Sequence, residues 1–242
     1  MIIVRLGEKR KSMNKRSVVF FFILLLNMFL MACSDSDKLK ENSTNTDLVG
    51  DIDLIGGYDE VTEEDVRKHP TTDSAFFEYY LDANTNDQGI MIAEYRGTDT
   101  IVVIPEEIDG KPVTAVAGCF GWDSQVQGIF VPNTVKRIRG TFAHNKCLEV
   151  VIAEGLERLD DLIFAECPKL HTIILGDSLK EIDALALYGV PALKELYIPK
   201  SVEVIDTYAL TGLHDDLVFK GEKGSRIEEY CIENELDFEI VD

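Results

Sequence analysis

The chain has 242 residues, of which 24 are lysine or arginine and 44 are aspartate or glutamate, so its formal net charge is −20. Binding of a phosphate backbone needs a basic patch, and none is visible, which argues against nucleic acid as a partner. The acidity can serve solubility or steer a basic partner over long range, and solubility is the favoured explanation.

A basic start followed by an apolar run marks the N-terminus. Lys15 and Arg16 precede residues 18–32, which are apolar except for Asn27. This order is typical of a secretory signal peptide, which we assign to residues 1–32; we favour Met13 as the start of translation, with a long basic leader from Met1 as the alternative. A single membrane-spanning helix is the other interpretation, but 15 residues are fewer than the roughly 20 that such a helix needs.

The apolar run ends at Leu30-Met31-Ala32-Cys33, which resembles the lipobox of bacterial lipoproteins. The resemblance implies that the Cys33 thiol is acylated and that cleavage leaves this residue as the new N-terminus. Several acyl chains on one cysteine would anchor the protein stably, whereas a single chain binds a membrane only marginally. The cleaved chain would retain 18 basic and 43 acidic residues, a net charge of −25.

Residues 33–60 are rich in Ser, Asp, Asn and Thr and contain few large apolar residues. They predict a flexible, lipidated tether. A short helix should follow at Glu63–Lys68, because Thr62 can cap it and Val61 and Val66 are placed as a hydrophobic staple.

Two strand-like segments, Phe76–Leu81 and Ile90–Tyr95, flank the polar segment Asp82–Gly89 and predict a β-hairpin. We expect this hairpin to cover the open edge of the sheet that follows and to shield it from stray strand pairing. Residues 61–97 are therefore assigned to the short helix and a capping hairpin.

The second half of the chain repeats one apolar spacing. One set of positions, at intervals of 22, 22, 23 and 23 residues, comprises Phe120, Phe142, Phe164, Leu187 and Leu210. A second set comprises Val116, Ile138, Leu159, Ile182 and Ile205. A fixed period of this length predicts a solenoid whose coils stack into one continuous core, here residues 98–242.

One unit shows the layout of a repeat. Its strand-like part ends at Pro132, after which Val135, Ile138 and Phe142 return to the interior. The consensus L-x-x-I-x-I-P-x-x-V-x-x-I-x-x-x-A-F-x-x-C resembles the BspA-like bacterial leucine-rich repeat over residues 90–242. Departures are Ala153 and Gly176 for the proline, and Leu187 and Leu210 for the phenylalanine.

The resemblance implies a right-handed coil with a curved parallel sheet of short strands, little regular helix, an N-terminal covering hairpin and a terminal unit near residues 219–238. It also implies a bacterial envelope protein that binds other proteins or host surfaces.

Cys147 and Cys167 occupy equivalent repeat positions, so adjacent coils should place them about 4.8 Å apart. A disulfide tolerates that separation, and an exported compartment can be oxidising. The alternative, which the family pattern also implies, is a ladder of small buried hydrophobic side chains, and we favour it. Cys119 and Cys231 are expected to be buried too.

Catalytic and metal-binding signals are weak. The histidines, His69, His144, His171 and His214, lie in separate segments and not at zinc-ligand spacing. The segment Asp51–Gly56 begins like a calcium loop, but Ile55 stands where an oxygen ligand is required. No nucleophile motif is present, so we expect that the protein is not an enzyme and that it uses no cofactor.

Residues that alternate with the core positions of the predicted strands should point outward and align across coils. The apolar column comprises Val103, Phe130, Val151, Ile174 and Tyr197, and the polar row beside it comprises Gln127, Glu149, His171 and Lys194. An unbroken apolar stripe on an exposed face indicates a binding site, with the polar row as its rim. Two alternatives stay open: the N-terminal segment folds over the stripe, or strand propensity alone selects these residues.

Together, these patterns predict an exported lipoprotein, anchored to the bacterial cell envelope and exposed at its surface. It would present a leucine-rich-repeat surface for protein binding or adhesion, with a host or envelope protein as partner. The alternative is a non-catalytic scaffold subunit whose stripe packs permanently against another envelope component.

Overall fold

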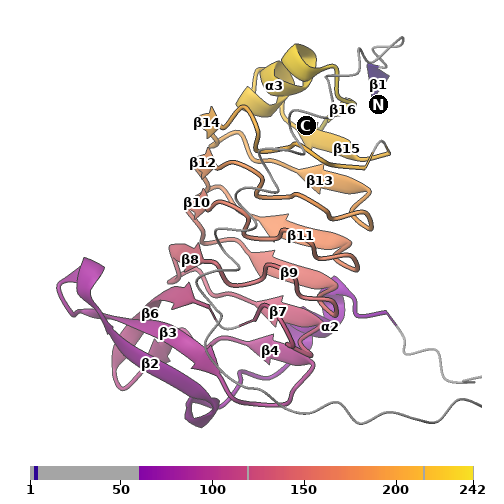
Figure 1. The fold of residues 1–242 in the computed structure, drawn as a ribbon. Helices are drawn as coiled ribbons and strands as arrows, with labels where there is room; N and C mark the ends of the chain where they lie inside the picture. Colours follow the sequence, from indigo (N-terminus) through magenta and orange to yellow (C-terminus); the bar gives the residue numbers. More distant parts are fainter. Residues whose placement is uncertain (1–2, 5–59, 119, 215, 242) are drawn as a thin grey trace, which may run out of the picture. The chain divides into compact units, whose positions relative to one another are not determined.

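The computed structural model describes residues 3–4, 60–118, 120–214 and 216–241. The chain winds into a β-solenoid of about seven turns, with parallel sheets and little helix (Figure 1). The predicted fold class is therefore confirmed. Apart from Ile3–Val4, the predicted signal peptide lies outside the described residues. So do Cys33, the tether up to residue 59, the segment Asp51–Gly56 and Cys119.

The elements of the described part are short. The helical elements are α2 (Glu63–Lys68), α3 (Arg226–Asn234), and the 3-10 helices η1 (Ser74–Phe76) and η2 (Ala83–Thr85). The strands are β1 (Ile3–Val4), β2 (Phe77–Asp82), β3 (Gly89–Tyr95), β4 (Ile101–Val103), β5 (Glu107–Ile108), β6 (Lys111–Ala117), β7 (Gly128–Phe130), β8 (Arg137–Arg139), β9 (Val150–Ala153), β10 (Arg158–Leu159), β11 (Thr172–Leu175), β12 (Glu181–Ile182), β13 (Glu195–Tyr197), β14 (Val204–Ile205), β15 (Val218–Gly221) and β16 (Phe238–Ile240).

Successive coils contribute parallel strands to two sides of the solenoid (Figure 1). On one side β4, β7, β9 and β11 pair in that order, and on another β10, β12 and β14 do so. Strands β13, β15 and β16 continue the stack at the C-terminal end, where β1 pairs antiparallel with β16.

The N-terminal hairpin caps the first coil, as predicted. Strand β2 pairs antiparallel with β3, and β3 pairs parallel with β6 of the first coil. Tyr95 of the hairpin also extends the aromatic stack of the interior, because its ring lies 5.3 Å from that of Phe77 and 5.6 Å from that of Phe120. The hairpin therefore closes the core as well as the sheet edge.

Asp82, at the end of β2, ties the hairpin to the solenoid. Its carboxylate is buried, accepts a hydrogen bond from Thr114 Oγ1 at 2.8 Å and lies 3.5 Å from Arg137 Nη2. Burial raises the pKa of Asp82, but hydrogen bonds from Asn84 and Thr114 and the charge of Arg137 outweigh it and leave the pKa below its usual value.

The two periodic sets of apolar residues form the core. All ten are buried, and the rings of Phe120, Phe142 and Phe164 stack with centroid separations of 5.9 and 5.5 Å. In the later coils Leu187 and Leu210 occupy the same position. Each coil therefore completes the core of its neighbours, as the period predicts.

The register of β9 corrects one reading of the sequence. Val151 pairs with Ile129 of β7 and Ile173 of β11, and it belongs to the core. Ala153 is likewise buried and pairs with Leu175, so Glu154, not Ala153, follows the strand where other coils have proline. The physical reason is that Val150, Val151 and Ile152 are all apolar, so alternation alone could not show which of them faces inward.

Cys147, Cys167 and Cys231 are free thiols. Cys167 and Cys231 are buried, as predicted, and burial raises the pKa of each thiol to about 12. Cys147 is only half-buried, so the predicted ladder of buried cysteines does not extend to it.

Candidate protein-binding surface

The outward side chains of β4, β7, β9, β11, β13 and β15 form what we call the strand face. Paired residues on neighbouring strands place two columns on it. The first comprises Ile101, Gly128, Val150 and Thr172, followed by Glu195 and Val218; the second comprises Val103, Phe130, Ile152 and Ile174, followed by Tyr197 and Lys220.

Four of the five predicted stripe residues thus point outward, and Val151 does not. The prediction for Val151 is wrong: its side chain belongs to the main core, and Ile152, paired with Phe130, occupies its place in the column. Of the predicted polar row, Lys194 is exposed, Gln127 and His171 are half-buried, and Glu149 is buried.

Helix α2 covers the apolar half of the strand face. Val61 and Val66 form a buried cluster with Val150 and Ile152, against which Ile101, Phe130 and Ile174 also pack. Gly128 makes this approach possible, because a Cβ atom there would lie 2.5 Å from Val66 Cγ2 and 3.1 Å from Val61 Cγ1. The alternative in which the N-terminal segment folds over the stripe is therefore the one that the structure shows.

Polar contacts fix α2 at both ends. The Val61 N–H donates to Glu149 Oε2 at 2.8 Å, and this buried bond explains why a carboxylate of the predicted rim is withdrawn from solvent. Arg67 Nη2 lies 2.8 Å from Glu154 Oε1. His171 Nε2 lies 3.1 Å from Glu60 Oε1, although without hydrogen-bond geometry.

The segment after α2 runs along the first strand of the face. The Thr72 N–H donates to the Val103 carbonyl at 2.9 Å, and the Val103 N–H donates to Thr72 Oγ1 at 3.0 Å. The backbone N–H and carbonyl of Val103 therefore both form hydrogen bonds within the chain. Residues 60–72, which we call the α2 segment, thus extend across the strand face from β11 to β4.

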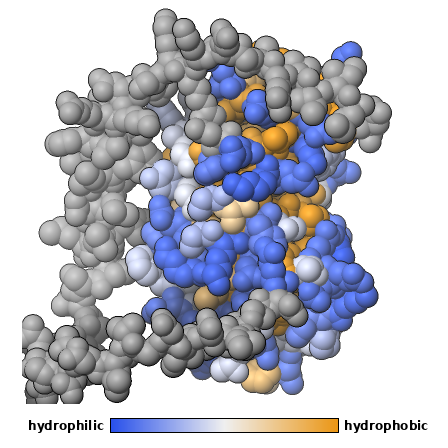
Figure 2. Space-filling model, turned by 90° about the vertical axis from the view of Figure 1, so that its right-hand side faces the viewer, coloured by the Kyte–Doolittle hydropathy of each residue, from blue (hydrophilic) through white to orange (hydrophobic). Residues whose placement is uncertain are grey.

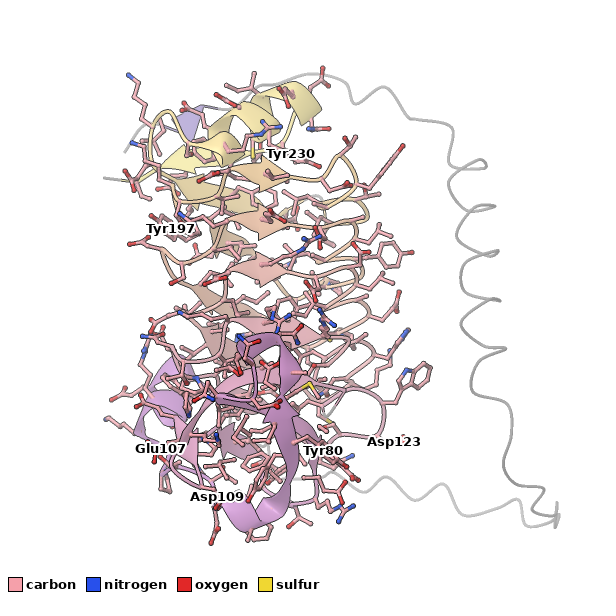
Figure 3. The ribbon with its side chains drawn as sticks, turned by 90° about the vertical axis from the view of Figure 1, so that its left-hand side faces the viewer. Tyr80, Glu107, Asp109, Asp123, Tyr197 and Tyr230 are labelled. Carbon is pink, nitrogen blue, oxygen red and sulfur yellow. The ribbon has the colours of Figure 1, made fainter. Side chains whose placement is uncertain are left out.

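The uncovered part of the strand face begins beyond Ile174. Tyr197 is 38% exposed, with Lys194 and Glu195 exposed beside it, and Lys220 of β15 donates to the Glu195 carboxylate. Partial burial, followed by the carboxylates of Glu222 and Asp177, raises the pKa of Tyr197 above its usual value. Tyr197 lies on one flank of the solenoid, well away from Tyr80 of the hairpin (Figure 3).

The change from covered to uncovered surface follows the sequence. Strand β9 is apolar at consecutive positions because both of its faces are buried. Strand β4 is equally apolar, with Val102 buried and Ile101 and Val103 half-buried, whereas β13 alternates Glu195, Leu196 and Tyr197. Seen from the right-hand side of Figure 1, patches of hydrophobic residues lie among hydrophilic ones at the surface (Figure 2). The continuous apolar runs were the signal that could have predicted a covering element.

The described side chains are suited to binding a partner by surface contact. No group of three or more His, Cys, Asp or Glu side chains among them is placed to hold a metal ion. Within the same residues, no helix has both the length and the apolar character of a membrane span.

Comparison with known proteins agrees with the fold. The BspA type leucine rich repeat region matches residues 115–239 in six copies, which is just over half of the chain. The crystal structure of a T. pallidum leucine rich repeat protein is similar, with 26% sequence identity, a TM-score of 0.57 and coverage of 62% of this chain and 71% of that chain. A leucine rich cell surface protein from Faecalibacterium prausnitzii shares 20% identity, with a TM-score of 0.34 and coverage of 64% of this chain and 55% of that chain.

A search of curated protein sequences gives no match. Leucine-rich-repeat proteins of this kind are typically non-enzymatic and suggest a scaffold for protein binding or adhesion. The six repeat copies, the continuous core and the capping hairpin all lead to one conclusion: this chain belongs to the BspA-type leucine-rich repeat family.

Proposed function

We propose that this protein is a lipid-anchored protein of the bacterial cell envelope that binds other proteins by surface contact. The apolar run of residues 18–32 and the lipobox-like sequence ending at Cys33 support export and anchoring. In this proposal residues 1–32 are a signal peptide, residues 33–60 a tether, residues 61–97 the helix and hairpin, and residues 98–242 the solenoid.

The observation that carries the binding proposal is the uncovered end of the strand face. Here the aromatic side chain of Tyr197 lies next to three charged residues, Lys194, Glu195 and Lys220. Tyrosine is enriched at binding hot spots because it combines a large apolar area with a polar tip. The uncovered β13–β15 part of the strand face therefore supports the proposed protein binding better than the covered stripe does.

A permanent scaffold subunit is less well supported. Its basis was an apolar stripe that needed a partner, and α2 now supplies a cover from within the chain. The remaining outward residues are mixed polar and aromatic, as at the interfaces of proteins that also exist alone.

Site-specific photo-crosslinking in intact cells tests this proposal. A benzoylphenylalanine residue is introduced at Tyr197 in one variant and at Tyr80 in a control, since Tyr80 is 58% exposed but lies on the hairpin. We expect discrete protein adducts from position 197 and none from position 80. Adducts from position 80 alone, or from neither position, would exclude the β13–β15 surface as the binding site.

A further inference from the structure

A second surface lies where each coil turns after the strands β6, β8, β10, β12 and β14. One residue per coil occupies the same position there, two residues before the buried core residue Phe120, Phe142, Phe164, Leu187 or Leu210. These residues are Gly118, Gly140, Leu162, Leu185 and Tyr208. The position thus changes from glycine in the early coils to large side chains in the later ones.

The backbone at this position is left-handed in four coils. Gly118 and Gly140 have φ values of 71° and 51°, and Leu162 and Leu185 both have φ values of 59°. Glycine adopts this conformation freely, but a bulky L-residue adopts it at a cost of about 1–2 kcal/mol. The two leucines are therefore strained where the chain elsewhere uses glycine, and strain of this kind accumulates at functional sites.

The strained leucines do not bury their side chains fully. Leu162 is 38% exposed, Tyr208 is 56% exposed and Leu185 is half-buried. The Leu162 N–H donates to the Ala184 carbonyl at 3.3 Å, and the Leu185 N–H donates to the Tyr208 carbonyl at 3.0 Å, so these turns stack directly. Leu162, Leu185 and Tyr208 thus lie at equivalent, partly exposed positions of three successive coils, and we call this row the leucine ridge.

A row of carboxylates runs beside the leucine ridge, two residues earlier in each coil. It comprises Asp160, Asp183 and Asp206. Arg158 pairs with Asp183, and it also lies 3.5 Å from Asp160 and 2.9 Å from Glu181, so one guanidinium serves three carboxylates. Burial is the main reason why the pKa of Asp160 lies above its usual value; Asp183 and Asp161 add to the rise, and Arg158 and Arg139 oppose it. Figure 3 views the molecule from the side that carries β8, β10, β12 and β14.

We propose that the leucine ridge and the adjacent aspartate row dock a cationic amphipathic segment of another protein. Its apolar side chains would lie on Leu162, Leu185 and Tyr208, and its lysine or arginine side chains would meet the carboxylates. The net charge of −20 would steer such a partner toward the protein. A second copy of the chain is a poor occupant, because it would bring the same aspartate row against the first.

This surface uses different strands from Tyr197, and its test does not depend on the proposed function. A synthetic leucine–lysine peptide designed as an amphipathic helix and carrying a fluorophore serves as the probe. Its binding to the full chain in nonionic detergent is followed by fluorescence anisotropy. We expect saturable binding that weakens as salt rises, and weaker binding of a peptide with the same composition in scrambled order.

The decisive variant is Leu162→Asn together with Leu185→Asn, because asparagine is polar and tolerates left-handed backbone. We expect the affinity for the peptide to fall about tenfold, with a melting temperature unchanged or slightly raised. Tyr208→Ser should also weaken binding without touching a left-handed position. The matched control is Ile232→Asn, since Ile232 of α3 is 59% exposed, and it should bind as the natural chain does.

Two results would overturn the proposal. Unchanged affinity in both the leucine and the Tyr208 variants would show that the ridge is not a docking surface. Equal binding of the scrambled peptide would show that charge alone attracts the probe, with no role for the leucine ridge.

Discussion

Asn145 is a fully buried polar side chain in the turn between β8 and β9. Its Nδ2 donates to the Phe120 carbonyl at 2.8 Å and to the Val126 carbonyl at 3.3 Å, and its Oδ1 accepts from the Cys147 and Leu148 N–H groups at 2.8 and 2.9 Å. One side chain therefore satisfies backbone groups of two coils in a place that water cannot reach.

We predict that Asn145→Ala lowers the free energy of unfolding by about 2–4 kcal/mol, because it leaves several buried backbone groups without partners. Urea denaturation monitored by circular dichroism would measure the change. The control is Asn133→Ala, since Asn133 is exposed, and it should change stability by less than about 0.5 kcal/mol. A similar small effect for both variants would contradict this role for Asn145.

At the scale of elements, α2 shows how a six-residue helix is stabilised by docking. Thr62 and Asp65 form a capping box, and Val61 and Val66 lie on the side that meets the sheet. A helix of this length is unstable alone in water, so its tertiary contacts must hold it. The absence of a side chain at Gly128 allows those contacts to form.

We predict that Gly128→Ala displaces α2, because its Cβ would overlap Val66 and Val61, and that it destabilises the protein by about 1–3 kcal/mol. Hydrogen exchange should then be faster at the amides of residues 61–68, while the amides of β13 and β15 keep their protection. The control is Glu195→Ala at the equivalent outward position of β13, because Glu195 is exposed and lies outside the cluster that α2 covers. Unchanged protection of α2 in the Gly128 variant would show that the helix does not need this gap.

The sequence predicted the coils, the hairpin and α2 because each has a local signal: a 22- or 23-residue period, two alternating segments around a polar turn, and a capped start at Thr62. The candidate site was predicted less well. Local sequence does not say which surface a docked helix covers, and the all-apolar run Val150–Ile152 hides which residue faces inward. The leucine ridge was missed because its signal is a backbone conformation, φ near 59°, at two leucines.

At the scale of the whole molecule, the proposed anchor and the solenoid have separate roles. The lipid at Cys33 would hold the protein at the membrane, and the acidic solenoid would remain in the aqueous phase. The two parts can therefore be tested independently.

We predict that Cys33→Ser abolishes incorporation of radiolabelled palmitate and moves the protein from the detergent phase to the aqueous phase in a phase-partition assay. Cys147→Ser is the matched control, because Cys147 is a half-buried thiol of the solenoid. It should leave both properties unchanged. Labelling that persists in the Cys33 variant would rule out the lipoprotein proposal.

The docking of the α2 segment also has a mechanical consequence. If the chain is held at its N-terminus and a bound partner pulls on the solenoid, tension enters the fold at residue 60. From there the α2 segment contacts β11, β9, β7 and β4 through Glu60, Val61, Val66 and Thr72. Such a load would therefore be distributed over several strands of the sheet rather than carried by the first coil alone.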